Sequence, residues 1–223
     1  MKVKLISYSQ PSKEFLEETN MGTLEELGSY CARVSNPSNQ NNTETSAKLI
    51  RYLIDHKHWS PLEMVNICIE IQTTRDIARQ ILRHRSFSFQ EFSQRYADPT
   101  KDLNFVEREA RLQDLKNRQN SIEGVDPFVQ YGWSVAQQKV IDASKDAYKW
   151  AIENGIAKEQ ARVVLPEGIM ESRMYMSGSL RSWVHYLQLR TANGTQKEHR
   201  EVAVACAKEI SKVFPMVDEL YGK

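Results

Sequence analysis

Residues 83–96, RHRSFSFQEFSQRY, bring together side chains that could bind an anion. Three arginines, one histidine and three serines lie in this stretch, and guanidinium groups and hydroxyls are the donors that phosphate takes. Its one carboxylate, Glu91, cannot neutralise all three arginines. We expect its three phenylalanines to bury the stretch, and buried arginines need anionic partners. The stretch therefore predicts a site for an anion from outside the chain.

A plainer interpretation of the same residues is a solvated helix end. The basic residues 83–85 would then face water, and the hydroxyls of Ser86, Ser88 and Ser93 would bond to their own backbone. The density of arginines and phenylalanines disfavours it. The sequence contains neither a GxxxxGK[ST] loop nor a GxGxxG turn after a strand, so a P-loop and a Rossmann site are excluded. A nucleotide or a flavin would have to be held in another way.

The chain as a whole is nearly neutral, with 30 Lys and Arg against 29 Asp and Glu in 223 residues. Proteins that bind duplex nucleic acid usually carry a clear basic excess, so the anion site must be local. Cys31, Cys68 and Cys206 are scattered, which favours free thiols in a reducing compartment. The sequence shows no signal-peptide core and no apolar run of membrane-spanning length, and we expect a cytoplasmic protein with no membrane partner.

The elements that must position the stretch can be read from hydrophobic periodicity. Residues 4–8 predict a strand, residues 24–34 and 43–56 predict helices, and residues 65–72 alternate as a half-buried strand does. A helix should carry residues 75–83, because Ile77, Ala78, Ile81 and Leu82 share one face. The basic residues 83–85 then stand at its C-terminal end, where the helix dipole favours positive charge. An extended or looped segment should follow.

The second half of the chain predicts further helices around a long polar loop or insertion at about residues 98–126. A long helix is expected from Pro127 to Asn154, where Trp133, Ala136, Val140, Ala143, Ala147 and Ala151 recur at steps of three and four. A short helix over 158–164, a strand at 174–176 and a helix capped by Ser179 come next. Thr195 and Glu198 predict a capping box for the last helix. The sum is an α+β fold with helix in excess, in a single domain spanning residues 1–223.

Three segments of this sequence resemble the motifs of flavin-dependent thymidylate synthases. The stretch meets the family signature, Arg-His-Arg, two positions, Ser, four positions, Ser, one position, Arg, with Arg83, His84, Arg85, Ser88, Ser93 and Arg95. HWSPLE at 58–63 is similar to the His-x-Ser/Thr-Pro-x-Glu element. ARVVLP at 161–166 and LQLR at 187–190 resemble two later elements. The resemblance covers about residues 30–210, and the insertion with the run NGTQ at 193–196 resembles a viral branch.

The resemblance implies a helix-rich fold around a small central antiparallel sheet and an enzyme that reductively methylates dUMP to dTMP. Methylenetetrahydrofolate would donate the one-carbon unit, and NADPH would supply reducing equivalents through FAD. In this family the hydride of the reduced flavin goes to C6 of uracil and the methylene to C5. No enzyme cysteine is then needed as a nucleophile, because the cofactor carries the difficult step.

The resemblance also implies which residues form the site. Arg190 would be catalytic, since an adjacent positive charge favours the enolate-like form of the uracil ring. The implied dUMP ligands are Gln80, Leu82, Arg83, Glu91, Phe92, Ser93, Arg95, Arg162 and Arg190. The implied FAD ligands are His58, Ser60, Arg83, His84, Arg85, Glu91, Ser179, Leu180, Arg181 and His185. No metal is implied, because His56 and His58 lack a third ligand at suitable spacing.

Other reactive side chains are expected to serve structure or binding. The three cysteines lie outside the motifs and are interpreted as small buried hydrophobic residues. Ser93 has no His-Asp relay in the sequence and is assigned to phosphate binding rather than to nucleophilic attack. Trp59, Trp133 and Trp183 are expected in the core rather than stacked on a cofactor ring.

The family is homotetrameric with active sites shared between subunits, which would explain arginines that lack partners within one chain. A viral member would work in the host cytoplasm. Two alternatives remain open. A single-stranded nucleic-acid-binding protein would place the arginines of residues 83–95 on phosphates and stack bases on the phenylalanines. A flavin- or folate-binding protein without catalysis would keep the same ligands.

Overall fold

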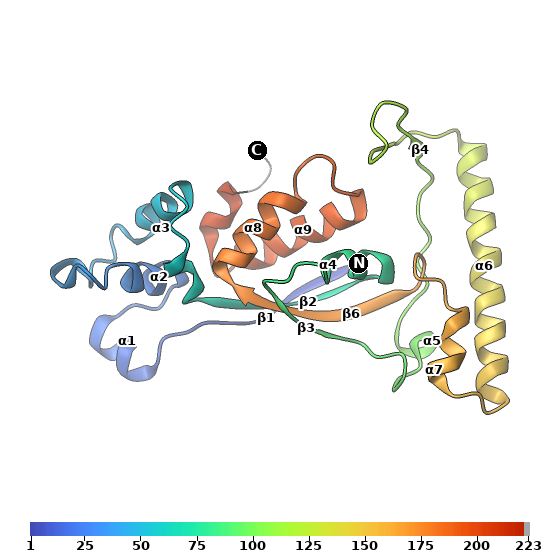
Figure 1. Ribbon diagram of the computed structural model, residues 1–223, viewed down its shortest axis with the longest axis horizontal. Coiled ribbons are helices and arrows are strands. Elements are labelled where there is room, and N and C mark those ends of the chain that lie inside the picture. Colours follow the sequence, from blue (N-terminus) through green and yellow to red (C-terminus); the bar gives the residue numbers. More distant parts are fainter. Residues whose placement is uncertain (221–223) are drawn as a thin grey trace.

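The fold is built on a four-stranded antiparallel sheet with the strand order β1-β2-β6-β3 (Figure 1). It is seen in a computed structural model that describes residues 1–220. The strands are β1 (Lys2–Tyr8), β2 (Asn66–Thr74), β3 (Ser88–Glu91) and β6 (Glu171–Ser179). The two central strands, β2 and β6, pair along their whole length, from Asn66 with Ser179 to Thr74 with Glu171. Strands β2 and β6 therefore form the centre of the sheet, with β1 and β3 at its edges.

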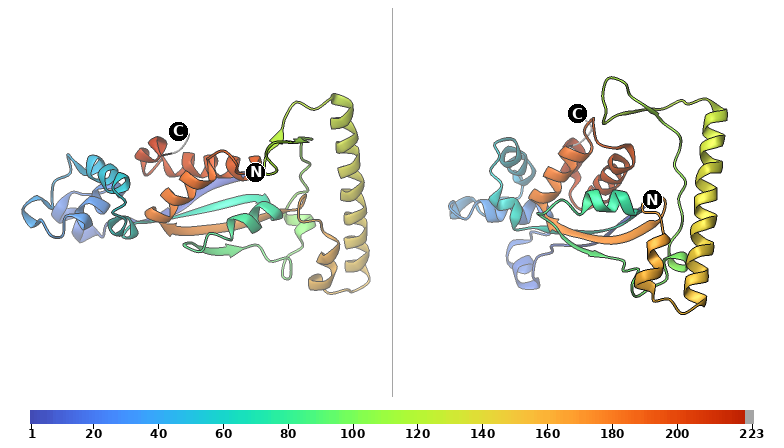
Figure 2. Two further views of the ribbon diagram at one scale, coloured as in Figure 1. Left: turned by 45° about the horizontal axis from the view of Figure 1, so that its top comes forward. Right: turned by 45° about the vertical axis from the view of Figure 1, so that its right-hand side comes forward.

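Two helices cover one face of the sheet, α8 (Leu180–Arg190) and α9 (Lys197–Ile210) (Figure 2). The apolar residues of β2 point to this face: Ile67, Ile69 and Ile71 are fully buried, while the residues between them are not. Trp183 of α8 is also fully buried, and its indole Nε1 donates to the carbonyl of Ile67 at 3.0 Å. The alternation of β2 therefore fixes which face carries the core.

Apart from α4, the remaining helices lie at the two ends of the sheet. Helices α1 (Lys13–Thr19), α2 (Leu24–Ala32) and α3 (Ser46–Asp55) gather at one end, and α6 (Pro127–Glu153) stands at the other (Figure 1). Two short helices, α5 (Pro99–Asp102) and α7 (Lys158–Ala161), lie beside α6, and α4 (Arg75–Ile81) directly follows β2. A two-stranded hairpin, β4 (Leu112–Gln113) with β5 (Ser121–Ile122), precedes α6.

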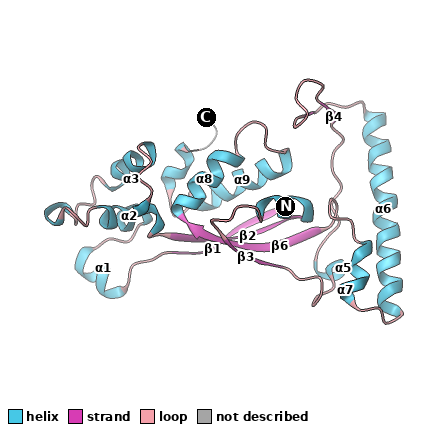
Figure 3. Ribbon diagram, viewed as in Figure 1, coloured by secondary structure: helices cyan, strands magenta, loops and turns pink. Residues whose placement is uncertain are grey.

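Most elements expected from periodicity are confirmed within a few residues, and the α+β class with a small antiparallel sheet is confirmed (Figure 3). The strand expected at 174–176 runs over nine residues, because Gly178 and the serines of β6 pair as regularly as its methionines. Helices α1 and α5 and the β4–β5 hairpin were not predicted. No helix within residues 1–220 is both long enough and apolar enough to cross a membrane.

The capping box expected for the last helix is wrong. Helix α9 has Gln196 as its N-cap residue, with no hydrogen bond from a capping side chain. The Thr195 hydroxyl instead donates to the carbonyl of Leu189 at 3.3 Å. Glu198 accepts hydrogen bonds from Gln196 and Arg111, so its carboxylate is occupied elsewhere.

The apolar spacing along α6 only partly matches the face that the helix buries, because Ala151 is the one residue of that series that is buried within the described chain. The residues that it buries within the chain are Gln137, Ile141, Ser144, Tyr148 and Ala151. The other residues of the series, from Trp133 to Ala147, lie on a neighbouring stripe that is exposed, including Trp133 at 45% and Val140 at 46%. The helix thus carries two apolar stripes, of which the single chain covers one.

Candidate active site

Arg190, the last residue of α8, is paired with the histidine of the basic stretch. Its Nε donates to Nε2 of His84 at 2.9 Å. A guanidinium only donates, so Nε2 of His84 must be the acceptor and the imidazole proton lies on Nδ1. Burial and then the charge of Arg190 lower the pKa of His84 to about 4. His84 is therefore neutral near pH 7 and can hold the guanidinium of Arg190 in place.

The basic residues 83–85 sit on a turn that begins where α4 ends. The His84 amide bonds to Ile81 O and the Phe87 amide to His84 O. The Phe87 ring is buried and packs edge-on against Trp183, with ring centroids 4.9 Å apart. A Cβ added at Gly178 would lie 2.5 Å from that ring, so only glycine leaves room for Phe87. These contacts pin the turn to the sheet and α8.

The turn leaves its arginines free within the chain. Arg83 and Arg85 are exposed, and neither side chain has a hydrogen bond or ion pair with any residue that the structure describes. The expectation that the stretch buries its arginines is therefore wrong for a single chain: Phe87 is buried, but the guanidinium groups point to solvent. Their positive charge is available to a ligand or to another subunit.

Glu91, at the end of β3, is held by arginines that the sequence interpretation missed. Arg79 donates to both of its carboxylate oxygens at 2.9 Å, and Arg75 lies 3.9 Å away. The Ser172 hydroxyl of β6 adds a third contact at 2.6 Å. Arg75 and Arg79 are four residues apart on α4, and this spacing on the polar face of a helix was the available signal. Glu91 pairs with them and not with Arg83, Arg85 or Arg95.

A cleft beside Glu91 collects further arginines. Its lining includes Arg75, Arg79, Arg162 and Gln94, and the arginines outnumber the two carboxylates there, Glu159 and Glu167. Gln94 is 4% exposed, and its Nε2 has no hydrogen-bond partner among residues 1–220. Several cations and a buried amide donor without a partner suit an anion such as phosphate.

Two of the expected dUMP ligands meet near this cleft. Arg95 forms an ion pair with Glu159 at 3.2 Å, and Arg162 donates from Nε to the carbonyl of the same residue at 3.3 Å. The Ser93 hydroxyl accepts from the Arg95 amide at 3.3 Å, and the Phe92 amide bonds to Arg173 O. No histidine is bonded to the Ser93 hydroxyl within the described chain, which agrees with a binding role.

Apart from Arg83, His84, Arg85 and Glu91, the expected flavin ligands lie along α8 towards its N-terminal end or on the segment before β2. Ser179 is the N-cap residue, and its side chain accepts from the Ser182 amide. Arg181 donates to Glu63 at 2.7 Å, and hydrogen bonds from Ser179 and then Arg181 lower the pKa of Glu63. The His185 ring packs edge-on against Trp59, with centroids 4.3 Å apart.

The remaining flavin candidates complete this second group. His58 and Ser60 are exposed on the segment before β2, and Leu180 is buried. Helix α8 has 11 residues, so its two ends are about 16 Å apart. One chain therefore brings the expected ligands together in separate groups rather than in one closed pocket.

The cysteines differ from the expectation that all three are buried. Cys206 is fully buried on α9, but Cys68 is half-buried and Cys31 is exposed. Partial desolvation of Cys31 and Cys68 and full burial of Cys206 raise the pKa of all three thiols above the usual range. A raised thiol pKa lowers the fraction of thiolate, the nucleophilic form. Trp133 departs from the core expectation too, since it is largely exposed, whereas Trp183 is buried.

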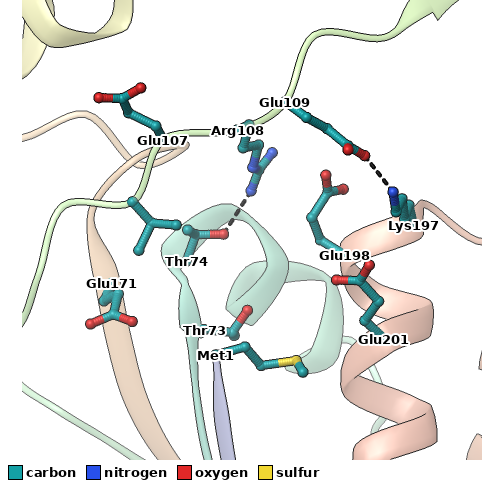
Figure 4. Close-up of a pocket in the computed structure, with 11 residues that line it drawn as sticks. Met1, Thr73, Thr74, Glu107, Arg108, Glu109, Glu171, Lys197, Glu198 and Glu201 are labelled. Carbon is teal, nitrogen blue, oxygen red and sulfur yellow. Dashed lines mark hydrogen bonds and ion pairs between the residues drawn. The ribbon is translucent and has the colours of Figure 1, made fainter. Parts of the chain in front are cut away.

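A second cavity lies at the N-terminal end of α9 (Figure 4). Carboxylates dominate its lining, among them Glu107, Glu109, Glu198 and Glu201. Lys197 neutralises part of this charge through an ion pair with Glu109. The surplus of negative charge repels a phosphate, so this cavity is not the expected nucleotide site.

Known proteins are similar to this chain over almost its whole length. Residues 6–216 match the family model described as Thymidylate synthase complementing protein. The chain is 48% identical over 217 residues to the "Probable flavin-dependent thymidylate synthase" of Paramecium bursaria Chlorella virus 1, covering 97% of both chains. It is 47% identical, with the same coverage of both chains, to the "Flavin-dependent thymidylate synthase" of a Synechocystis species.

Solved structures share the fold at lower sequence identity. The UMP/dUMP methylase PolB from Streptomyces cacaoi, in a crystal structure bound with 5-Br dUMP, superposes with a TM-score of 0.78 at 24% identity. The alignment covers 98% of this chain and 93% of that chain. The helix-rich arrangement around the small sheet is therefore common to both proteins.

Proposed function

The chain belongs to the flavin-dependent thymidylate synthase family, and we propose that it reductively methylates dUMP to dTMP. It is therefore a methyltransferase that depends on FAD. Methylenetetrahydrofolate would be the one-carbon donor and NADPH the reductant. The observation that carries the proposal is the pair of Arg190 with neutral His84, beside a turn whose arginines are free.

The role of Arg190 is to polarise the uracil ring. Its Nε is committed to His84, so its two terminal nitrogens remain to donate to ring oxygen or deprotonated ring nitrogen. A fixed positive charge beside the ring stabilises the negative charge that develops there. Because His84 is neutral, it restrains the guanidinium without weakening that charge. Neutral His84 thus supports Arg190 as the catalytic residue.

The nucleotide phosphate and sugar would be bound by the groups around β3. Arg95 and Arg162 approach the same residue, Glu159, and both guanidinium groups are exposed. Gln80, Leu82, Arg83, Glu91, Phe92 and Ser93 complete the proposed dUMP ligands. Arg75 and Arg79 hold Glu91 through ion pairs, so they act as positioning residues for the nucleotide site.

The residues present fit a flavin dinucleotide. Arg83 and Arg85 are exposed cations with no side-chain partner among residues 1–220, as a diphosphate requires. His84 has its Nδ1 proton to donate, and Arg181 is held by Glu63 next to Ser179 and His185. With His58, Ser60, Leu180 and Glu91, these residues would hold FAD. When bound, FAD would supply the hydride that the reduction needs.

We propose a homotetramer with active sites shared between subunits. On α6, the residues Trp133, Ala136, Val140, Ala143, Ala147 and Trp150 follow one another at steps of three and four. This spacing is that of a helix seam that packs on another helix, yet all six residues are exposed in the single chain. The same assembly would supply partners for the free arginines.

The alternative of a single-stranded nucleic-acid binder is disfavoured by the phenylalanines. Base stacking needs exposed aromatic faces. Phe87 is buried against Trp183, and Phe89 and Phe92 are only partly exposed.

An anaerobic assay tests the proposal. The purified protein should be yellow and should convert labelled dUMP to dTMP only when methylenetetrahydrofolate and NADPH are both supplied. Bound flavin without any dTMP would favour the binding protein that lacks catalysis. A colourless protein that retains single-stranded nucleic acid would contradict both enzymatic and flavin-binding roles.

A further inference from the structure

Two buried aromatic residues with polar atoms lie next to the Arg190–His84 pair. Tyr186 of α8 is 1% exposed and His199 of α9 is fully buried. Their ring centroids are 5.8 Å apart, and the Tyr186 ring packs edge-on against His84 at 4.9 Å. Neither residue belongs to the sequence motifs, and buried polar side chains of this kind are usually hydrogen-bonded.

A chain of hydrogen bonds leads from a carboxylate to His199. Glu198 is ionised: burial acts to raise its pKa, but hydrogen bonds from Arg111, its own backbone amide and Gln196 lower it. An ionised carboxylate only accepts, so Gln196 donates to it from Nε2, at 2.9 Å. Oε1 of Gln196 then accepts from Nε2 of Gln80 at 2.7 Å. The amide orientation of Gln80 is thereby set.

The same chain fixes the tautomer that His199 must adopt. With its Nε2 donating to Gln196, Gln80 turns Oε1 towards Nδ1 of His199, at 3.2 Å. A carbonyl oxygen accepts, so Nδ1 of His199 must carry the proton and donate. Burial, followed by the charge of Arg190, lowers the pKa of His199 to about 3, which leaves the ring neutral with a single N–H.

Two buried polar atoms of these residues have no hydrogen-bond partner within residues 1–220, and one is an acceptor while the other is a donor. Within residues 1–220, neither Nε2 of His199 nor the hydroxyl of Tyr186 has a hydrogen-bond partner. Nε2 of the Nδ1-protonated ring is an acceptor, whereas a phenolic hydroxyl is a donor. A buried water often joins such groups when they are near but not in direct contact.

We propose that His199 is a positioning residue for Gln80 and that Tyr186 maintains its tautomer by donating, through one bridging water, to His199 Nε2. The inference rests on the proposed function, in which Gln80 is a dUMP ligand. Gln80 keeps one N–H and one oxygen lone pair beyond the bonds described, and these would face the nucleotide in a fixed orientation. Loss of the bond from His199 would let the amide rotate.

The tautomer can be measured without any assay of activity. In the intact flavoprotein labelled with ¹⁵N-histidine, the two ring nitrogens of His199 should show the pattern of a neutral Nδ1–H tautomer, assigned by comparison with His199→Leu. Tyr186→Phe should shift the Nε2 signal of His199 while leaving the ring neutral. An Nε2–H tautomer in the wild type, or no shift in Tyr186→Phe, would overturn the inference.

Kinetics distinguish positioning from simple packing. His199→Leu removes the donor, whereas His199→Asn keeps an amide donor near the position of Nδ1. We expect His199→Leu to raise the KM for dUMP about two- to tenfold with kcat little changed, since one neutral hydrogen bond contributes about 0.5–1.5 kcal/mol. His199→Asn should restore the KM to within about twofold. Equal KM values in wild type and His199→Leu would refute the positioning role.

The two proposals fail in different ways. If the wild type makes no dTMP, the proposed function is wrong, and the ¹⁵N measurement still decides the tautomer of His199. If the wild type is active but His199 carries its proton on Nε2, only the positioning role is wrong. A His199→Leu variant that does not fold leaves His199→Asn and Tyr186→Phe to supply the assignment and the comparison of KM.

Discussion

At the scale of single residues, Arg190 is the side chain on which the proposed chemistry depends. His84 occupies its Nε, and the terminal nitrogens are left for the ring. The variant Arg190→Lys should have little dTMP-forming activity. Lysine keeps the positive charge but lacks the planar guanidinium, so it cannot both bond His84 and reach the ring with a fixed geometry.

We predict that Arg190→Ala lowers kcat for dTMP formation by about 10²–10³-fold, the usual cost of removing one preorganised donor. FAD should remain bound, because Arg190 is not itself one of the proposed flavin ligands. Steady-state kinetics and the flavin absorbance of the purified variant measure the two effects. Arg51→Ala is the control, since Arg51 pairs with Glu219 on the surface and should be dispensable. Turnover of Arg190→Ala near the wild-type rate would remove Arg190 from catalysis.

Half-buried His84 and fully buried His199 make stability depend on pH. The pKa of His84 is lowered to about 4 and that of His199 to about 3, against an ordinary value of about 6.5. At a pH between the folded and the unfolded pKa of each histidine, the unfolded chain binds more protons than the folded chain. The free energy of unfolding therefore falls as the pH falls from 6.5 towards 4. Urea denaturation at pH 7 and pH 5 should show the loss, and His199→Leu should reduce it. Titration of either histidine near pH 6.5 in the folded protein would contradict the prediction.

Sequence motifs identified the residues of the site but not their partners. Arg190 and His84 come from motifs and Gln80 from the family resemblance, whereas the roles of Arg79 and His199 became visible only when the fold brought α4 close to β3 and α9. Pairing across a fold depends on tertiary position, which spacing along one element does not contain. The same limit explains why the arginines of the stretch were expected to be buried.

At the scale of elements, the turn after α4 is held by the contact of Phe87 with β6. Gly178→Ala should destabilise the protein by about 1–3 kcal/mol, because the new methyl group would overlap the Phe87 ring. Gly132→Ala in α6 is the control: nothing lies within 4 Å of an added Cβ there, and alanine favours the helix. The midpoints of urea denaturation compare the variants. Equal midpoints for Gly178→Ala and the wild type would show that Phe87 does not fix the turn.

Strong periodicity predicted the elements well, and weak or ambiguous patterns did not. The alternation of β2 and the length of α6 were read correctly, while α1 and the β4–β5 hairpin are too short and polar to give a clear signal. The spacing of apolar residues did not show which face of α6 is buried, because the exposed and the buried stripes follow similar steps. Thr195 failed as a cap because Glu198 had a better-placed partner in Arg111.

At the scale of the whole molecule, the exposed seam of α6 and the arginines without partners in the described chain support the proposed tetramer. We predict that Val140→Glu, in the exposed seam, reduces the mass in light scattering from that of a tetramer and lowers activity with it, because it would bury a charge between subunits. Lys139→Glu is the control on an adjacent exposed face of the same helix. A wild-type protein that runs as a monomer at assay concentration would contradict shared active sites.

The central claim is that guanidinium groups of Arg83, Arg95, Arg162 and Arg190 surround a pyrimidine monophosphate beside a flavin. A crystal structure of the assembled enzyme with FAD and dUMP tests it most directly. We predict that Arg190 contacts the uracil ring while the other three, drawn from more than one subunit, contact the phosphate or the flavin. The claim is contradicted if both ligands are bound and these four side chains still face solvent.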